Sequence, residues 1–391
     1  MLDAKPEAQS ADAAFVSEES APAAVVPKKN DRLEIDRYFE ALVKLDGSDL
    51  HLKVDQPPIM RVKGSLQRLK APPIGHEQMK SLCLPMLDDR QMKILEDEGG
   101  ADFAYSSLIG DTRWRFRVNL LYQQGSLGMV ARKVNNTIPN FEKLFLPASI
   151  ERLCTLDQGM VLLAGVTGSG KSTTIGSMLN YINRNYRKHI LTLEDPVEFV
   201  HKSQGCIINH REVGIHTQSF SSALRGALRE DPDVILVGEM RDLETISLAL
   251  EAASTGHLVF GTLHTQSAGK TIDRVIDVFP ANQQAQIRTT LSEALKGVIA
   301  QNLFKRVDKK GRMAVLEILV VTAAVSNLIR EGKTFQIPSV IQTGKKYGMQ
   351  SLDDSILKAL EEKKISAEDA FDKAIVKDRF VPFLKTPPEF Y

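Results

Sequence analysis

Residues 165–172 have the types and the spacing of a loop that binds nucleotide phosphates, G-x-x-x-x-G-K-[ST]. Its glycines let the backbone wrap closely around phosphates, its lysine reaches the outer phosphates, and its last hydroxyl holds Mg²⁺. Lys171 is the expected phosphate-binding lysine and Ser172 the expected Mg²⁺ ligand. The predicted nucleotide-binding residues are Gly165, Thr167, Gly168, Ser169, Gly170, Lys171, Ser172 and Thr173. The sequence therefore predicts a nucleoside triphosphate and Mg²⁺ as ligands.

The residues on either side predict the elements that hold this loop. Residues 161–164 are an apolar run of the buried-strand type, and after the loop apolar residues recur at helical spacing at Ile175, Met178, Leu179 and Ile182. Strand, loop and helix thus agree with one another. Kinases, GTPases, helicases and motors all share the loop, so it does not by itself assign a function.

Apolar strands alternate with helical patterns in this part of the chain, which is typical of an α/β domain with a parallel sheet and crossover helices. The predicted strands are residues 161–166, 189–194, 233–238 and 258–263. Ligands of open α/β sheets lie beyond the carboxyl ends of the strands. We therefore expect the polar residues at these four ends to converge on the nucleotide.

Two of these strand ends carry acidic residues. The strand that precedes Glu239 resembles the second motif of nucleotide-binding proteins, although Gly238 stands where an Asp is usual. Glu239 is the residue expected to orient or deprotonate the attacking water. Glu194 opens an acidic segment, residues 194–198, which we assign to Mg²⁺, water or a basic neighbour because phosphates repel bare carboxylates.

His257 and His264 flank the predicted strand 258–263. A single histidine is more often a structural group than a functional one. Two histidines that bracket a strand pointing at the phosphates favour a role in sensing the nucleotide. Both are therefore candidate site residues.

A predicted strand in the first part of the chain is rich in arginine. In residues 113–120 the two-residue period of a strand puts Arg113, Arg115 and Arg117 on one face and apolar residues on the other. The arginine face is either a solvated sheet surface or a surface that faces an anion, and the pattern alone favours the solvated surface. Arg132 lies in the next predicted strand.

Composition excludes several classes of protein. Hydrophobic residues make up 43% of the 391 residues and charged residues 25%, as in soluble globular proteins. The net charge of +1 gives no electrostatic footprint for nucleic acid. Cys83, Cys154 and Cys206 lack the spacing of a zinc ribbon or a disulfide framework, so each is expected to be a small buried residue in a reducing cytosol. No apolar run approaches the length of about 18 residues that spans a bilayer.

The pattern divides the chain into five segments. Residues 1–31, rich in Ala, Pro, Ser and Glu, are expected to form a disordered tail. Residues 32–137 are expected to form a domain of mixed α and β structure, and residues 138–148, which contain two prolines, a linker. Residues 149–375 are the predicted nucleotide-binding domain with its C-terminal helices, and residues 376–391 are a predicted second tail.

The motifs occur in an order that resembles the type II/type IV secretion ATPase superfamily. They are the phosphate loop, the acidic segment 194–198, residues 227–233 (Ala-Leu-Arg-Glu-Asp-Pro-Asp), the strand end Gly238-Glu239 and the two-histidine segment 256–265. The resemblance covers about residues 32–375.

Within the superfamily the chain resembles the branch that retracts type IV pili in twitching motility. Residues 48–52 (Ser-Asp-Leu-His-Leu), followed by two prolines, match the amino-terminal domain of that branch. The four-cysteine zinc insert common in pilus-extension and type II secretion ATPases is absent from the sequence. Residues 324–331 resemble the retraction signature AIRNLIRE, with Val325-Ser326 in place of Ile-Arg. The departure leaves open whether the chain is a principal retraction motor or an accessory paralogue.

The resemblance implies a PAS-like domain followed by a RecA-like P-loop ATPase core, a homohexameric ring, and hydrolysis of ATP with Mg²⁺ between the two domains of each subunit. Arg117 and Arg132 match the two arginines that the first domain of this family contributes to the phosphates, a role that suits the planar guanidinium group. The implied partners are a pilus platform protein of the inner membrane and a paralogous retraction ATPase, without nucleic acid. The implied location is cytoplasmic, with peripheral association at the inner face of the cytoplasmic membrane.

Two other classes of function share the phosphate loop. A nucleic-acid motor on a RecA-like core would also share the strand-end glutamate, but the net charge near zero speaks against it. A small-molecule kinase or a GTPase is the other class. The chain lacks the [NT]-K-x-D motif of guanine selection, and a kinase has no evident need of Glu239.

Overall fold

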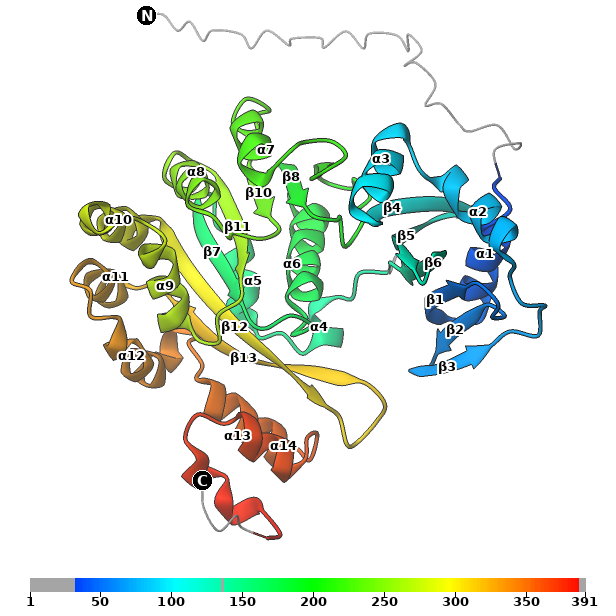
Figure 1. Cartoon of the computed structure of the whole chain (residues 1–391). Coiled ribbons are helices and arrows are strands. Elements are labelled where there is room, and N and C mark those ends of the chain that lie inside the picture. The colour runs from blue at the N-terminus through cyan, green and yellow to red at the C-terminus, as the bar shows by residue number, and fades with distance from the viewer. Residues whose placement is uncertain (1–31, 135–136, 387–391) are drawn as a thin grey trace, which may run out of the picture. The chain divides into compact units, whose positions relative to one another are not determined.

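The computed structural model of the chain describes residues 32–134 and 137–386, and two β-sheets organise them (Figure 1). The chain divides into two compact units. The first unit contains the residues up to Ala101 together with 107–109 and 119–130, and the second contains 102–106, 110–118 and the chain from Ala131 onward.

The six-stranded sheet has the strand order β3-β2-β1-β6-β5-β4. Its strands are β1 (Gly47–Lys53), β2 (Ile59–Val62), β3 (Ser65–Arg68), β4 (Gly100–Ile109), β5 (Thr112–Gln123) and β6 (Ser126–Lys133). The helices in this part of the chain are α1 (Asp36–Lys44), α2 (His76–Cys83), η1 (Leu84–Met86) and α3 (Asp89–Glu98). The mixed α and β character predicted for it is confirmed.

Local sequence explains where these elements begin and end. Asp88 and Gln91 form a reciprocal capping box at the start of α3, and Gly99 follows its end in the left-handed conformation with φ 74°. β5 and β6 are joined by Gln124 and Gly125, which both have positive φ, as a two-residue hairpin turn of type I′ requires. The turn fixes the register of the arginine-rich strand β5 against β6.

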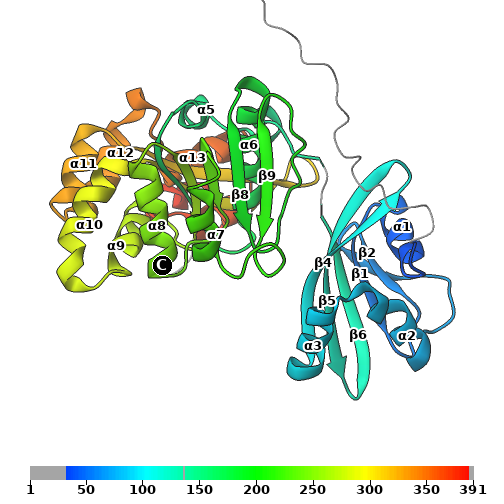
Figure 2. The same cartoon turned by 90° about the horizontal axis from the view of Figure 1, so that it is seen from above.

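The seven-stranded sheet has the strand order β13-β12-β7-β11-β10-β8-β9 (Figures 1 and 2). Its strands are β7 (Gly159–Ala164), β8 (His189–Glu194), β9 (Ile207–Glu212), β10 (Val234–Val237), β11 (Leu258–Leu263), β12 (Leu295–Lys305) and β13 (Arg312–Val320). Neighbouring strands are parallel except β12 and β13, which are antiparallel. The predicted parallel sheet is confirmed, and the four predicted strands are β7, β8, β10 and β11. The sequence pattern did not predict β9, β12 and β13, because polar residues such as His210, Gln301 and Glu317 interrupt their apolar runs.

Helices cover both faces of this sheet. They are α4 (Phe141–Leu144), α5 (Ala148–Cys154), α6 (Lys171–Asn185), α7 (Phe220–Ala227), α8 (Leu243–Ser254), α9 (Ala268–Asp277), α10 (Ala281–Ala294), α11 (Ala323–Arg330), α12 (Ile337–Thr343), α13 (Leu352–Glu361) and α14 (Ala367–Lys373), with the short helices η2 (Thr334–Gln336) and η3 (Lys345–Tyr347). Along β7, Met160 and Leu162 pack in the cluster that includes α8, α9 and α10, whereas Val161 and Leu163 pack with α5 and α6. An apolar residue at every position is what a parallel strand covered on both faces requires.

The C-terminal part of the chain differs from the predicted tail. Residues 376–386 include η4 (Lys377–Arg379) and η5 (Val381–Phe383), and Phe380 is fully buried in a cluster with residues of α13 and α14. Burying an aromatic side chain contributes strongly to a core, so the packed chain extends beyond residue 375. The predicted linker is also partly helical, because it contains α4. The predicted tail over residues 1–31 lies outside the described residues.

The three cysteines are free and buried, as predicted. Burial raises the pKa of the Cys83 thiol to about 12, so this side chain stays a neutral, small apolar group. Within residues 32–134 and 137–386, no helix is both long enough and apolar enough to cross a membrane.

Candidate functional site

The phosphate loop connects the central strand β7 to α6, and its glycines are required by its shape. Gly165, Gly168 and Gly170 have φ of 148°, 78° and 90°, which side-chain-bearing residues rarely adopt. A Cβ on Gly165 would lie 2.4 Å from Ser169 Oγ, and one on Gly170 would lie 2.7 Å from Gln301 Nε2. A Cβ on Gly168 would meet nothing within 4 Å, so only its backbone conformation requires glycine there.

Lys171 begins α6 and is folded back onto the loop. Its side chain is nearly buried, and Nζ donates hydrogen bonds to the carbonyl oxygens of Gly165 (2.6 Å) and Val166 (3.3 Å). Burial lowers the pKa of Lys171, while the charge of Glu239 opposes this change. The ammonium group is thus held at the start of a helix, where the backbone N–H groups also attract anions.

The loop fits a phosphate group on a further observation. Ser169 Oγ is buried and has no hydrogen-bond partner within the described chain, and a buried hydroxyl without a partner is costly. Ser169 lies between two glycines of the loop, where a phosphate oxygen would satisfy it. Ser172 follows Lys171 in the first turn of α6 and is half-buried. Its role as a Mg²⁺ ligand stays a prediction.

Lys171→Ala is expected to abolish tight ATP binding, because no other side chain of the loop supplies its charge. ATP affinity and steady-state turnover measure this. Lys188→Ala is a matched control, since Lys188 is paired with Asp157 and lies after α6. Hydrolysis by Lys171→Ala at the rate of the unmodified protein would contradict the assignment of the phosphate loop.

Gln301 on β12 supports the loop and was missed from the sequence. Its Nε2 donates to Ser169 O at 2.8 Å, and its Oε1 accepts from Thr174 Oγ1 at 2.7 Å. One buried amide therefore joins the loop to the first turns of α6. The available signal was a polar residue inside the otherwise apolar run of β12, because a buried strand does not tolerate an unpaired amide.

Gln301→Ala is expected to lower the free energy of unfolding by about 1–3 kcal/mol, since Ser169 O and Thr174 Oγ1 lose their buried partner. It should also weaken ATP binding, because the loop loses its attachment to β12. Thermal unfolding and ATP titration measure both effects. Asn302→Ala is the control, because Asn302 is the next residue of the strand and projects to its other face. Equal effects of the two variants would contradict this role of Gln301.

Glu239 follows β10 after Gly238, and its carboxylate contacts an imidazole and a guanidinium group. His264 Nε2, beyond the end of β11, is 3.0 Å from Glu239 Oε1. The guanidinium of Arg241 binds both carboxylate oxygens, with a distance of 2.6 Å from its terminal nitrogen to Oε2. Burial alone would raise the pKa of Glu239, but the hydrogen bond from Arg241 and the charges of Arg241, His264 and Lys171 lower it. Glu239 is therefore ionised and suited to accept a hydrogen bond from water.

The structure explains why glycine replaces the usual Asp before Glu239. A Cβ at Gly238 would lie 3.0 Å from Leu193 O and 3.2 Å from Glu194 Cα on the neighbouring strand β8. The Gly238 N–H donates to Leu193 O at 2.7 Å, which keeps the two strand ends this close. A side chain at this position would push them apart.

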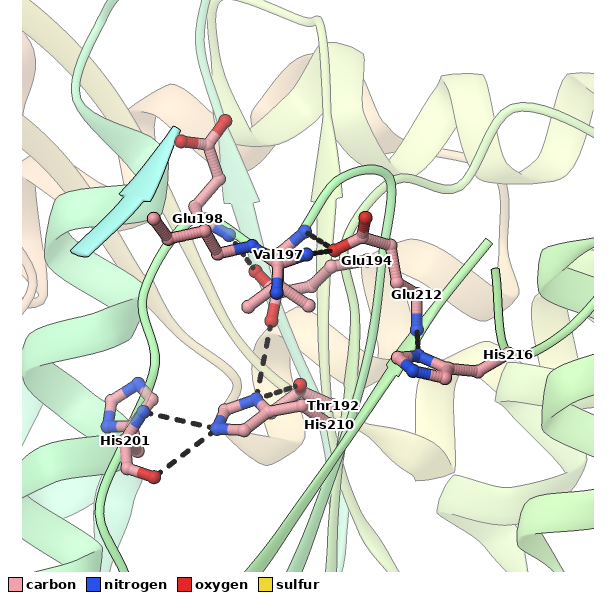
Figure 3. Close-up of polar contacts among 9 residues, drawn as sticks. Thr192, Glu194, Val197, Glu198, His201, His210, Glu212 and His216 are labelled. Carbon is pink, nitrogen blue, oxygen red and sulfur yellow. Dashed lines mark hydrogen bonds and ion pairs between the residues drawn. The ribbon is translucent and has the colours of Figure 1, made fainter. Parts of the chain in front are cut away.

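Glu194 ends β8 in a buried position (Figure 3). Its Oε2 accepts the Glu198 N–H at 3.1 Å, and its Oε1 lies 3.9 Å from His210 Nδ1. Burial raises the pKa of Glu194 to about 7, partly offset by hydrogen bonds from Glu198 and Thr192. The His210 ring therefore lies beside this carboxyl group, and the assignment of the acidic segment to Mg²⁺, water or a basic neighbour stays a prediction.

His257 does not lie at the end of β11 where His264 contacts Glu239. His257 precedes β11, whereas His264 follows it, so the two residues lie at opposite ends of a six-residue strand. His257 Nδ1 is 3.0 Å from Ala252 O at the end of α8. Within this chain His257 has a structural contact, and about 20 Å of strand separates it from His264. The sensing role predicted for both histidines stays a prediction, and the geometry places only His264 beside Glu239.

Arg117 and Arg132 occupy neighbouring strands, β5 and β6, and both are exposed. The Val134 N–H bonds to Arg115 O at 2.9 Å. Moving two residues along each antiparallel strand from this bond places Arg117 opposite Arg132 on one face. Like charges in this position repel, and a bound anion would relieve the repulsion. The predicted alternation of β5 is confirmed for Phe116 and Val118, which are buried, while Arg115 is half-buried and not solvated as expected.

The fold and the site define a class of protein, an ATPase whose phosphate loop, strand-end glutamate and histidine lie at the carboxyl edge of a parallel sheet. The model of the family described as "Type II/IV secretion system protein" matches residues 35–371, and the chain belongs to this family.

Similar proteins narrow the class. The chain is 48% identical over 348 residues to the "Type IV pilus retractation ATPase PilT" of Pseudomonas aeruginosa, a match that covers 89% of this chain and 100% of that protein. It is 37% identical over 343 residues to the "Type IV pilus ATPase PilU" of the same organism, covering 88% and 89% of the two chains. It also matches the crystal structure of the pilus retraction motor PilT with bound ADP, with a TM-score of 0.82 and 42% identity over 89% of this chain and 99% of that chain.

Proposed function

We propose that this chain is an ATP-driven motor that retracts type IV pili by removing pilin subunits. The observation that carries the proposal is the similarity over the whole length of a pilus retraction ATPase, at 48% identity. The carboxyl edge of the seven-stranded sheet supplies the chemistry, because the phosphate loop, Glu239 and His264 follow the adjacent strands β7, β10 and β11. ATP is the substrate and water is the acceptor.

Different residues of the site bind the phosphates of ATP and orient the attacking water. The loop N–H groups, Lys171 and Ser169 hold the phosphates of ATP, and Lys171 neutralises part of their charge. Glu239, once released from Arg241, accepts a hydrogen bond from the attacking water and orients it toward the γ-phosphorus. The water oxygen bonds to phosphorus as the bond to ADP breaks, and its proton leaves to Glu239 or to solvent. Mg²⁺, held by Ser172 and the phosphates, would supply further neutralisation of charge.

The arginines complete the proposed site. By resemblance, Arg117 and Arg132 stabilise the charge that develops on the transferred phosphoryl group. Their placement opposite each other on β5 and β6 supports a joint role, since two guanidinium groups can bind several oxygens of one phosphate. Loss of the γ-phosphate removes the anion that both bind, which releases a nucleotide-dependent clamp and allows movement.

The proposed assembly is a homohexameric ring that works on a platform protein at the cytoplasmic face of the inner membrane, with which the chain associates peripherally. A paralogous retraction ATPase is a further proposed partner, and nucleic acid is not. A principal motor is favoured over an accessory one, since the identity to PilT is 48% and that to PilU is 37%.

Deletion of the gene, scored for surface pili and twitching, tests the proposal. We expect more pili and loss of twitching, restored by the unmodified gene and not by Lys171→Ala. Twitching that persists at a reduced level would favour the accessory role. Unchanged pilus number and twitching would contradict retraction, and ATP turnover stimulated by nucleic acid would favour the rival motor.

A further inference from the structure

Polar side chains occupy one face of the neighbouring strands β8 and β9, at the edge of the sheet. The two strands are parallel, with Thr192 opposite His210 and Glu194 opposite Glu212. Because side chains alternate along a strand, these four project from the same face. Figure 3 shows His210 between Thr192 and Glu194, with its Nδ1 at 2.7 Å from Thr192 Oγ1.

The hydrogen bonds of His210 determine which of its ring nitrogens carries the hydrogen. Its Nε2 accepts the backbone N–H of His201 at 3.1 Å, and the distance from Nε2 to His201 O is longer, at 3.4 Å. Nε2 is therefore the acceptor of a neutral ring, and Nδ1 carries the hydrogen. Burial lowers the pKa of His210 and lowers that of the stacked ring of His201 to about 4, which keeps both rings neutral.

The direction of the hydrogen bond between His210 and Thr192 determines where the hydroxyl hydrogen of Thr192 points. His210 Nδ1–H donates to Thr192 Oγ1, so the hydroxyl hydrogen of Thr192 is directed to another acceptor. The neighbouring acceptor on this face of β8 is the carboxyl group of Glu194, two residues further along the strand, and a hydrogen bond from Thr192 is among the causes that lower its pKa. A directional chain thus runs from the His201 backbone through His210 and Thr192 to Glu194. Glu198 N–H donates to Glu194 as well, so two donors fix this carboxyl group.

We propose that His210 is a positioning residue for ATP hydrolysis, which acts through Thr192 to hold Glu194 in one orientation toward Mg²⁺ and water. The inference rests on the proposed ATPase function and on the expectation from the sequence that Glu194 serves Mg²⁺ or water there. Without the ring of His210, the Thr192 hydroxyl can rotate about its C–O bond and no longer gives Glu194 a fixed hydrogen. His210 itself touches neither the nucleotide nor the water in this proposal.

The test compares variants that remove the chain of hydrogen bonds with variants that preserve it. His210→Ala and Thr192→Val are each expected to lower kcat about tenfold or to raise the half-saturating Mg²⁺ concentration by that factor, with the KM for ATP unchanged. His210→Gln and Thr192→Ser should recover most of this loss, because a Gln amide can accept from His201 and donate to Thr192, and Ser keeps the hydroxyl. His189→Ala is the matched control, since His189 begins β8 and contacts Asn209 of β9 at 2.9 Å; it should leave kcat and the Mg²⁺ response unchanged.

A double variant separates positioning from packing. In the Glu194→Gln background, His210→Ala should add little to the loss, because His210 acts through Glu194. An added loss of the same tenfold size, or equal losses in His210→Ala and His210→Gln, would overturn the inference. If Glu194→Gln lowers kcat but His210→Ala does not, only the positioning role of His210 is overturned. Glu194→Gln with full turnover would instead overturn the proposed role of Glu194, and this inference with it.

Discussion

Arg117→Ala and Arg132→Ala are each expected to lower ATP turnover by about 10³–10⁵-fold, the range associated with an arginine that stabilises phosphoryl transfer. The family resemblance assigns them to the phosphates, and the register of β5 and β6 places them opposite each other. Because both would bind the same group, the double variant should lose little more than either single one. Steady-state turnover and ATP affinity measured side by side would show a loss mainly in rate.

Arg113→Ala provides the internal control for this prediction. Arg113 lies on the same face of β5 as Arg117 and is exposed, but it matches neither of the two arginines of the family. Its replacement should leave turnover nearly unchanged. Small and equal losses in Arg113→Ala, Arg117→Ala and Arg132→Ala would indicate a general effect of positive charge and would contradict a two-arginine clamp.

Glu239→Gln is expected to lower turnover by about 10²–10⁴-fold while ATP affinity is retained, because Gln keeps the shape of the side chain but is a far weaker acceptor for water. The variant also loses the charge that Arg241 and His264 contact. Nucleotide titration and single-turnover hydrolysis separate binding from the chemical step.

Glu244→Gln is a matched control for Glu239→Gln, since it removes an exposed carboxylate that pairs with Arg225 at the start of α8. It should leave both affinity and turnover unchanged. An affinity loss in Glu239→Gln as large as its rate loss would show that Glu239 supports the metal or the structure, and does not act on water.

The sequence by itself determined the parts of the site that are local in the chain. The spacing of glycines and lysine in residues 165–172 predicts a phosphate loop because the shape of the loop depends on local backbone dihedrals, such as the positive φ of Gly165, Gly168 and Gly170. The apolar runs of β7, β8, β10 and β11 predict a parallel sheet, and the sheet then requires their polar carboxyl ends to share one edge. This rule predicts that Glu239 and His264 lie near each other, and Glu239 Oε1 is 3.0 Å from His264 Nε2.

Only the tertiary structure decided the contacts made across the sheet. Gln301 and Thr174 are separated by 127 residues yet share a hydrogen bond, and Thr192 meets His210 only because β8 and β9 pair in one particular register. His257 and His264 flank β11 in the sequence and therefore lie at its opposite ends in space, so only His264 reaches Glu239. Local pattern fixes which face a side chain occupies, but its neighbours on that face depend on which strands pair and in which register, a property of the whole sheet.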